Sequence, residues 1–170
     1  MKMYKKIINF IKKIFNNYFE LAVAVSATMI VVLAITMDWI FFLQACPMCI
    51  LTRYVFLLLA ICGLIAFFIK KKFIGHFMIL ISSFLGLFVT AKQIYIQNMS
   101  PEDIGMLSGC SMPFHTQVEY FGIFEAISKT LAGGPSCAED GWRFILNFAE
   151  WGFLFFLIYF ISSLISLKKG

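Results

Sequence analysis

Four long apolar stretches, separated by polar segments, lie at about residues 21–43, 50–69, 74–95 and 151–167. A helix needs roughly 20 mostly apolar residues to cross the hydrocarbon core of a bilayer, and each stretch approaches that length. The serines within the third stretch are compatible with a span, because intrahelical hydrogen bonds satisfy the backbone in lipid. The pattern predicts an all-α membrane protein: a bundle of four transmembrane helices that forms one integral membrane domain over residues 1–170.

The first apolar stretch follows several lysines, as the core of a cleavable signal sequence would. Residues 21–43 are longer than such a core, which has about 7–15 residues, and no small-x-small cleavage site ends them. Two acidic residues, Glu20 and Asp38, lie near the two ends of this stretch. We expect it to be retained as the first span.

A weaker helical pattern lies in the long polar segment between the third and fourth stretches, residues 96–150. Apolar side chains recur there at spacings of three and four, before Gly133-Gly134-Pro135 ends the pattern: Val118, Phe121, Phe124, Ile127 and Leu131. This spacing predicts a short amphipathic helix. The helix either lies along the membrane surface or packs on the rest of the loop.

The composition excludes an ordinary soluble domain. Hydrophobic residues make up 61% of the chain and aromatic residues 18%, and the mean hydropathy is +0.89. A soluble protein of this size needs far more polar surface around its core. The apolar excess therefore agrees with the four predicted spans.

The net charge of +5 is a signal of topology rather than of nucleic-acid binding. Ten of the fourteen basic residues lie in three short groups beside apolar stretches: Lys2, Lys5, Lys6, Lys12 and Lys13; Lys70, Lys71 and Lys72; Lys168 and Lys169. Positive loops stay on the cytoplasmic side. We expect both termini and the 70–72 turn to be cytoplasmic, with outer loops at about residues 44–49 and 96–150.

Four of the five cysteines fall in the two predicted outer loops. Cys46 and Cys49 form a Cys-x-x-Cys in the short loop, Cys110 and Cys137 lie in the long one, and Cys62 sits alone in the second span. An even set on an oxidising face indicates two disulfides. Cys62 is expected to have a packing role only.

Zinc binding and purely structural disulfides are the two alternatives to redox chemistry. A Cys-x-x-Cys is a common zinc half-site, but Cys110 and Cys137 are not closely spaced, and His115 would be a lone loop histidine. A structural bridge between Cys46 and Cys49 would close a loop too small to remove much chain entropy. We therefore favour thiol–disulfide exchange, without a metal, and leave both alternatives open.

Two neighbours of Cys49 favour its thiolate form. Cys49 begins the second span, where the positive end of the helix dipole stabilises negative charge. Arg53 follows one helical turn later on the same face, and a guanidinium within a span needs a partner, a function or access to the headgroups. A cation beside a thiolate in the membrane suits a lipid-soluble electron acceptor such as a quinone.

These features, in this order along the sequence, make the chain resemble the DsbB family of bacterial thiol:quinone oxidoreductases over essentially its whole length. The resemblance is carried by four spans, by Cys-x-x-Cys-x-x-x-Arg at Cys46, Cys49 and Arg53, and by the second pair, Cys110 and Cys137. Residues 137–142 read Cys-Ala-Glu-Asp-Gly-Trp, which is similar to the family's Cys-Ala-Glu-x-x-Trp.

The resemblance implies a role for each of these residues. Cys110 would be attacked by a reduced, DsbA-like periplasmic partner, and Cys137 would pair with Cys110 and then exchange with Cys46. Cys49 would face a ubiquinone or menaquinone, with Arg53 orienting its ring oxygen. The amphipathic stretch would be a membrane-lying segment that tethers the second pair. The resemblance also implies a bacterial inner membrane, with the cysteine pairs facing the periplasm.

Two other functions remain to be weighed. A quinone-linked protein of the vitamin K epoxide reductase type would also have four spans and a Cys-x-x-Cys, but its cysteine order differs. A non-catalytic membrane scaffold with two structural disulfides would have a Cys46–Cys49 bridge that resists mild reductant and a replaceable Arg53.

Overall fold

The structure is a computed structural model of the whole chain. It describes residues 18–43, 45–69, 72–107, 112–138, 143 and 145–169. Four long helices dominate these residues: α2 (Phe19–Phe41), α3 (Pro47–Phe68), α4 (Lys72–Gln97) and α8 (Phe148–Lys169). Each is long and apolar enough to cross a membrane, so the prediction of an all-α protein with four spans is confirmed.

All four long helices begin two or three residues earlier than the hydropathy pattern predicts, and at α3 and α8 the added residues follow an N-terminal cap. Helix α3 begins at Pro47, a residue that suits the first turn, and the Cys46 sulfur accepts the backbone N–H of Cys49 at 3.2 Å. Before α8, Asn147 and Glu150 form a reciprocal capping box, with both side chain-to-backbone distances 2.8 Å. These polar caps extend the helices beyond their apolar stretches.

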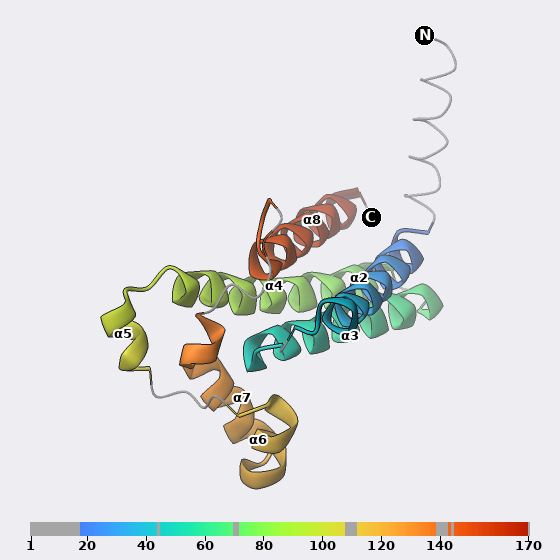
Figure 1. Ribbon diagram of the computed structural model, residues 1–170. Coiled ribbons are helices and arrows are strands. Elements are labelled where there is room, and N and C mark those ends of the chain that lie inside the picture. Colours follow the sequence, from blue (N-terminus) through green and yellow to red (C-terminus); the bar gives the residue numbers. More distant parts are fainter. Residues whose placement is uncertain are drawn as a thin grey trace.

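The four helices pack in chain order, so that each inner helix lies between its sequence neighbours (Figure 1). Helix α3 packs against α2 and α4, and α4 packs against α3 and α8. Phe56 of α3 and Phe156 of α8 stack with their ring centroids 4.0 Å apart. Gly86 of α4 makes room for this pair, since a Cβ at that position would lie 2.3 Å from the Phe156 ring.

Polar contacts join the helices at the end of the bundle that is remote from Cys46 and Cys49. On α4, His76 Nε2 lies 2.9 Å from Ser166 Oγ of α8 and 3.8 Å from Glu20 Oε1 of α2. Closer to the middle of the bundle, the Tyr159 hydroxyl of α8 donates to Ser26 Oγ of α2 at 2.9 Å. These contacts hold the two edge helices, α2 and α8, together over this half.

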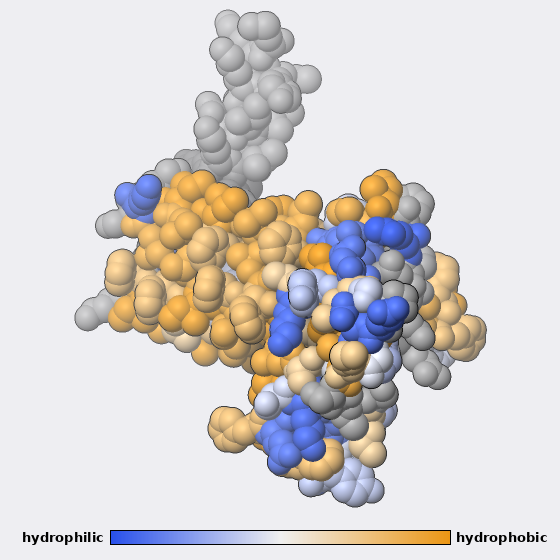
Figure 2. Space-filling model, turned by 90° about the vertical axis from the view of Figure 1, so that its left-hand side faces the viewer, coloured by the Kyte–Doolittle hydropathy of each residue, from blue (hydrophilic) through white to orange (hydrophobic). Residues whose placement is uncertain are grey.

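The surface agrees with a membrane location for the long helices. Large apolar side chains such as Leu33, Ile61, Phe84 and Ile158 are exposed along them. Figure 2 shows this apolar surface on the helical body, while hydrophilic residues gather at one end, beside the short loop helices. Exposure of this kind suits lipid as the surrounding solvent.

The long loop forms short helices instead of one amphipathic helix: α5 (Pro101–Gly105), α6 (Phe114–Phe121), α7 (Ile123–Ala132) and the 3-10 turn η1 (Pro135–Cys137). Gly122, with φ +80°, separates α6 from α7, because this backbone conformation does not continue a helix.

The apolar face predicted for the loop helix is divided between two environments. Val118, Ile127 and Leu131 pack against a cluster that includes Leu51 of α3 and Val89 of α4. Phe124, in contrast, is 91% exposed. Helices α6 and α7 therefore pack on the bundle itself, and contact of their exposed residues with the membrane surface stays a prediction.

Candidate functional site

The Cys-x-x-Cys pair lies where α3 begins. Cys46 is the N-cap residue, Cys49 is in the first turn, and both are free thiols with their sulfurs 2.8 Å apart. The exposed backbone N–H groups of a helix N-terminus favour thiolate character in such a pair. This end of the bundle is called the cysteine end below.

The third cysteine at this end comes from the long loop. Cys137 closes the turn η1, is 1% exposed, and packs with Met48 of α3 and Ile96 of α4. Cys46 packs against the same cluster, and its thiol lies close enough to the Cys137 sulfur for each to shift the pKa of the other. The fold thus brings one cysteine of the second predicted pair against the first cysteine of the other.

The thiols of Cys46 and Cys137 differ in pKa. The hydrogen bond from Cys46 lowers the pKa of Cys137 to about 6, with further hydrogen bonds from the backbone of Met48 and Gly134 and from Ser136, and these outweigh the effect of burial. Hydrogen bonds to Cys137 and Cys49, followed by burial, raise the pKa of Cys46. Cys137 is therefore the thiolate of the pair and Cys46 the proton donor.

This difference predicts an acidic titration of Cys137 in the reduced protein. Its thiolate should appear with a midpoint near pH 6, because the lowered pKa keeps the deprotonated form as the pH falls from neutral. An unperturbed thiol would titrate at about 8.5. The ultraviolet thiolate absorbance of wild type minus Cys137→Ser measures the midpoint. In a Cys46→Ala background the midpoint should rise, and a wild-type midpoint near that of a free thiol would contradict the geometry.

Arg53 lies on α3 one turn beyond Cys49, as its spacing predicts, and it has a partner that the sequence analysis missed. Its Nη1 is 2.6 Å from Oδ2 of Asp38 in the last turn of α2, with the two side chains 19% and 20% exposed. A carboxylate within an apolar span is the sequence signal that identifies Asp38 as a candidate. Its pairing across two helices required the structure.

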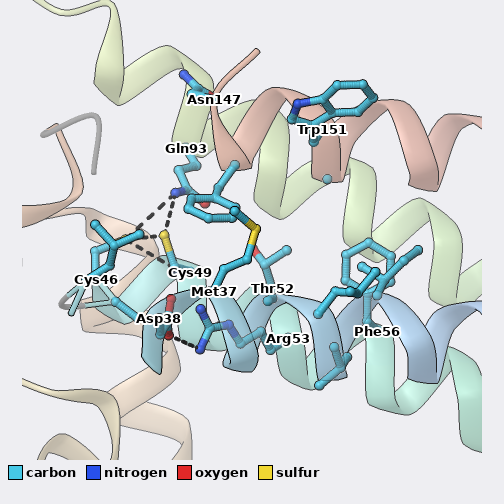
Figure 3. Close-up of a pocket in the computed structure, with 18 of the residues that line it drawn as sticks. Met37, Asp38, Cys46, Cys49, Thr52, Arg53, Phe56, Gln93, Asn147 and Trp151 are labelled. Atoms are coloured by element: carbon cyan, nitrogen blue, oxygen red, sulfur yellow. Dashed lines mark hydrogen bonds and ion pairs between the residues drawn. The ribbon is translucent and has the colours of Figure 1, made fainter. Parts of the chain in front are cut away.

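A second missed residue is Gln93 of α4, which is 1% exposed. Its side-chain nitrogen lies 3.0 Å from the Cys49 sulfur and 3.7 Å from the Cys46 sulfur (Figure 3). A buried amide can donate to either sulfur and stabilise negative charge there. The signal in the sequence is a polar residue near the end of an apolar stretch, which does not by itself indicate a contact with sulfur.

A cavity of about 430 Å³ begins beside Cys49 and is of the size usual for small-molecule sites. Ala34 and Met37 of α2 and Trp151 and Phe155 of α8 contribute to its apolar walls. Polar side chains line the cysteine end of the same cavity: Arg53, Asp38, Gln93, Gln97 and Asn147. Asn147 donates to Gln97 Oε1 at 3.0 Å and so joins the start of α8 to the end of α4. The cavity combines a polar end that contains a reactive sulfur with an apolar body between the edge helices.

The structure therefore brings Cys46, Cys49, Arg53 and Cys137 together at one end of the bundle. Cys110 and residues 139–142 lie outside the described residues. Cys62 is buried within α3, accepts a hydrogen bond from Ser82 Oγ at 3.3 Å, and does not line the cavity. In the part of the chain that the structure describes, no three His, Cys, Asp or Glu side chains form a group suited to a metal ion.

Comparisons with a family model and with individual proteins agree on one family. A family model described as "Disulfide bond formation protein DsbB" matches residues 16–166. A relative named "Disulfide bond formation protein B" from Polaromonas naphthalenivorans (strain CJ2) is 33% identical over 126 residues, which cover 72% of this chain and 73% of the relative. A relative of the same name from Paracidovorax citrulli (strain AAC00-1) is 31% identical over 133 residues, or 75% of this chain and 73% of the relative.

Proposed function

The chain belongs to the DsbB family of disulfide bond formation proteins, and we propose that it is a membrane thiol:quinone oxidoreductase. In this proposal it reoxidises a soluble DsbA-like dithiol oxidase and passes the electrons to membrane quinone, which supports disulfide formation in exported proteins. The observation that carries the proposal is the position of Cys137 against Cys46, whose Cys-x-x-Cys partner Cys49 lines the cavity.

The proposed relay begins at the loop pair. A thiolate of the partner attacks Cys110 in a Cys110–Cys137 disulfide, and Cys137 leaves as a thiolate. The partner's second thiolate then displaces Cys110 and completes the partner's own disulfide. The low pKa of Cys137 favours the first step, since a thiol of lower pKa is the better leaving group.

The electrons then pass to the inner pair. The Cys137 thiolate attacks Cys46 of a Cys46–Cys49 disulfide, and Cys49 leaves as a thiolate, stabilised by the Gln93 amide at 3.0 Å. Cys110 next attacks Cys137, restoring the Cys110–Cys137 disulfide and releasing Cys46. One dithiol has been oxidised in the partner and one formed at Cys46 and Cys49, so electrons and protons balance.

The cavity fits a quinone as the final acceptor. A quinone accepts two electrons and two protons, which the Cys46–Cys49 dithiol supplies as it becomes a disulfide. Arg53 and Gln93 offer N–H donors at the polar end, where a ring oxygen would need them, and the walls between α2 and α8 suit an isoprenoid tail. Ubiquinone and menaquinone both meet these requirements.

The same proposal assigns a location. The lysine-rich termini and the lysines at 70–72 support a cytoplasmic placement of those segments. The cysteine end then faces the periplasm of a bacterial inner membrane, where disulfides form and a soluble partner can reach Cys110.

Turnover with purified components tests the proposal directly. We expect the protein in detergent to reduce added ubiquinone or menaquinone rapidly when a reduced DsbA-like protein is supplied, with quinone absorbance as the readout. Cys62→Ala, a cysteine change on α3 away from the cavity, should retain the wild-type rate. Absence of turnover with either quinone, together with disulfides that stay intact, would overturn the proposal in favour of a structural scaffold.

A further inference from the structure

We propose that Asp38 is a positioning residue, which holds the Arg53 guanidinium and limits the positive charge that Arg53 presents to Cys49. This inference rests on the proposed function, because it concerns the site where Cys49 would react. Asp38, Arg53 and Cys49 all line the same cavity, and Asp38 reaches Arg53 from a different helix.

The backbone of Asp38 is fixed by the end of α2. Its carbonyl oxygen accepts the backbone N–H of Phe42 and, at 3.1 Å, that of Leu43, while Phe42 has the left-handed backbone conformation with φ 51°. These bonds close the helix at a defined residue. The Asp38 side chain therefore starts from a rigid position and reaches α3 across the short α2–α3 connection.

The location of Asp38 is unfavourable unless the carboxylate has a partner. A negative charge in the last turn of a helix opposes the helix dipole, and no basic residue shares that turn. An ionised residue within a membrane span is also costly. Arg53 at 2.6 Å offsets both effects, so the pair exists only because each residue compensates the other.

The Asp38–Arg53 ion pair changes the electrostatic potential at the Cys49 sulfur. Without Asp38, a full positive charge would stand one helical turn from Cys49 on the same face of α3. With Asp38 in place, Arg53 Nη1 is directed toward α2, and the carboxylate offsets part of the positive charge that reaches the sulfur. Negative charge on Cys49 is then stabilised mainly by neutral donors, the Cys46 thiol at 2.8 Å and the Gln93 amide at 3.0 Å.

A purely mechanical role for the ion pair makes a different prediction. If the pair only ties α2 to α3, then removing either partner loosens the same contact and changes Cys49 in the same direction. If Asp38 limits the charge of Arg53, removing Asp38 and removing Arg53 have opposite effects on the Cys49 thiolate. The sign of the two effects therefore separates the roles.

The test is the alkylation rate of Cys49 in the reduced, quinone-free full-length protein, followed by site-resolved mass spectrometry at one fixed pH. Asp38→Asn should accelerate alkylation, by about threefold to tenfold, because the uncompensated guanidinium favours the thiolate. Arg53→Gln should slow it. Glu102→Gln removes an exposed acid from α5 as a matched charge control and should leave the rate unchanged.

Two further variants keep the test decisive if a single variant does not fold. Asp38→Glu keeps the negative charge, and its alkylation rate should equal that of wild type. The double variant Asp38→Asn/Arg53→Gln contains no uncompensated charge, and its rate should lie within about threefold of wild type, since the two charges offset each other in the native pair. Same-direction effects of the two single variants, or no effect of Asp38→Asn, would overturn the proposal. The assay requires no turnover, so failure of quinone reduction would leave its result standing.

Discussion

Replacing Cys137 by serine is expected to stop electron transfer from a DsbA-like protein while leaving the inner pair able to oxidise a small dithiol. Cys137 is the only cysteine of the described loop residues 112–138, and its thiol lies against Cys46. Serine is a far poorer nucleophile, so we expect the rate with the protein partner to fall at least about a thousandfold. Quinone reduction at saturating partner measures the loss.

The same Cys137→Ser protein contains its own control. A small dithiol at high concentration can attack the Cys46–Cys49 disulfide directly, and quinone reduction driven in this way should stay within a few-fold of wild type. If Cys137→Ser retained normal turnover with the protein partner, the electrons would bypass Cys137 and the proposed relay would be wrong.

Replacing Cys49 by alanine is expected to abolish quinone reduction with every reductant. The Cys49 sulfur lines the cavity together with Arg53 and Gln93, and without it the inner disulfide cannot form. The rate should fall to the uncatalysed background for the protein partner and for a small dithiol alike. Absorbance of the oxidised quinone again provides the measurement.

The contrast between the two variants carries the information. Cys137→Ser blocks electron transfer from the protein partner to the inner pair, whereas Cys49→Ala blocks electron transfer from both reductants to the quinone. Cys62→Ala, on the same helix as Cys49, controls for the loss of a buried sulfur from α3. Residual quinone reduction by Cys49→Ala with a small dithiol would show that another group reacts with the acceptor.

Hydropathy alone predicted the number and order of the long helices, because each span must bury a continuous apolar length. Their boundaries were less accurate, since polar residues such as Asn147 and Glu150 extend α8 beyond its apolar residues through a capping box. The loop pattern was right about apolar spacing and wrong about continuity. One glycine, Gly122 at φ +80°, divides it into α6 and α7.

The site was predictable where its residues are neighbours in sequence. The spacing of Cys46, Cys49 and Arg53 places them at one helix start, and the structure has them there. Asp38 and Gln93 were missed because their contacts run between helices. Such contacts depend on how each helix rotates about its axis, and that rotation follows from packing over the whole bundle. Roles for the cysteines stay predictions until the variants are measured.

The position of Cys49 has a further consequence for the depth at which oxidation takes place. Cys49 is the third residue of α3, so its sulfur lies within roughly 5 Å of the helix start, in a span that crosses a hydrocarbon core of about 30 Å. Under the proposed function, a quinone would have to bring its ring to this boundary, near the headgroup layer, while its tail stays in the hydrocarbon. A water-soluble donor and a lipid-soluble acceptor could then exchange electrons at the membrane surface, and neither would have to cross into the other's solvent.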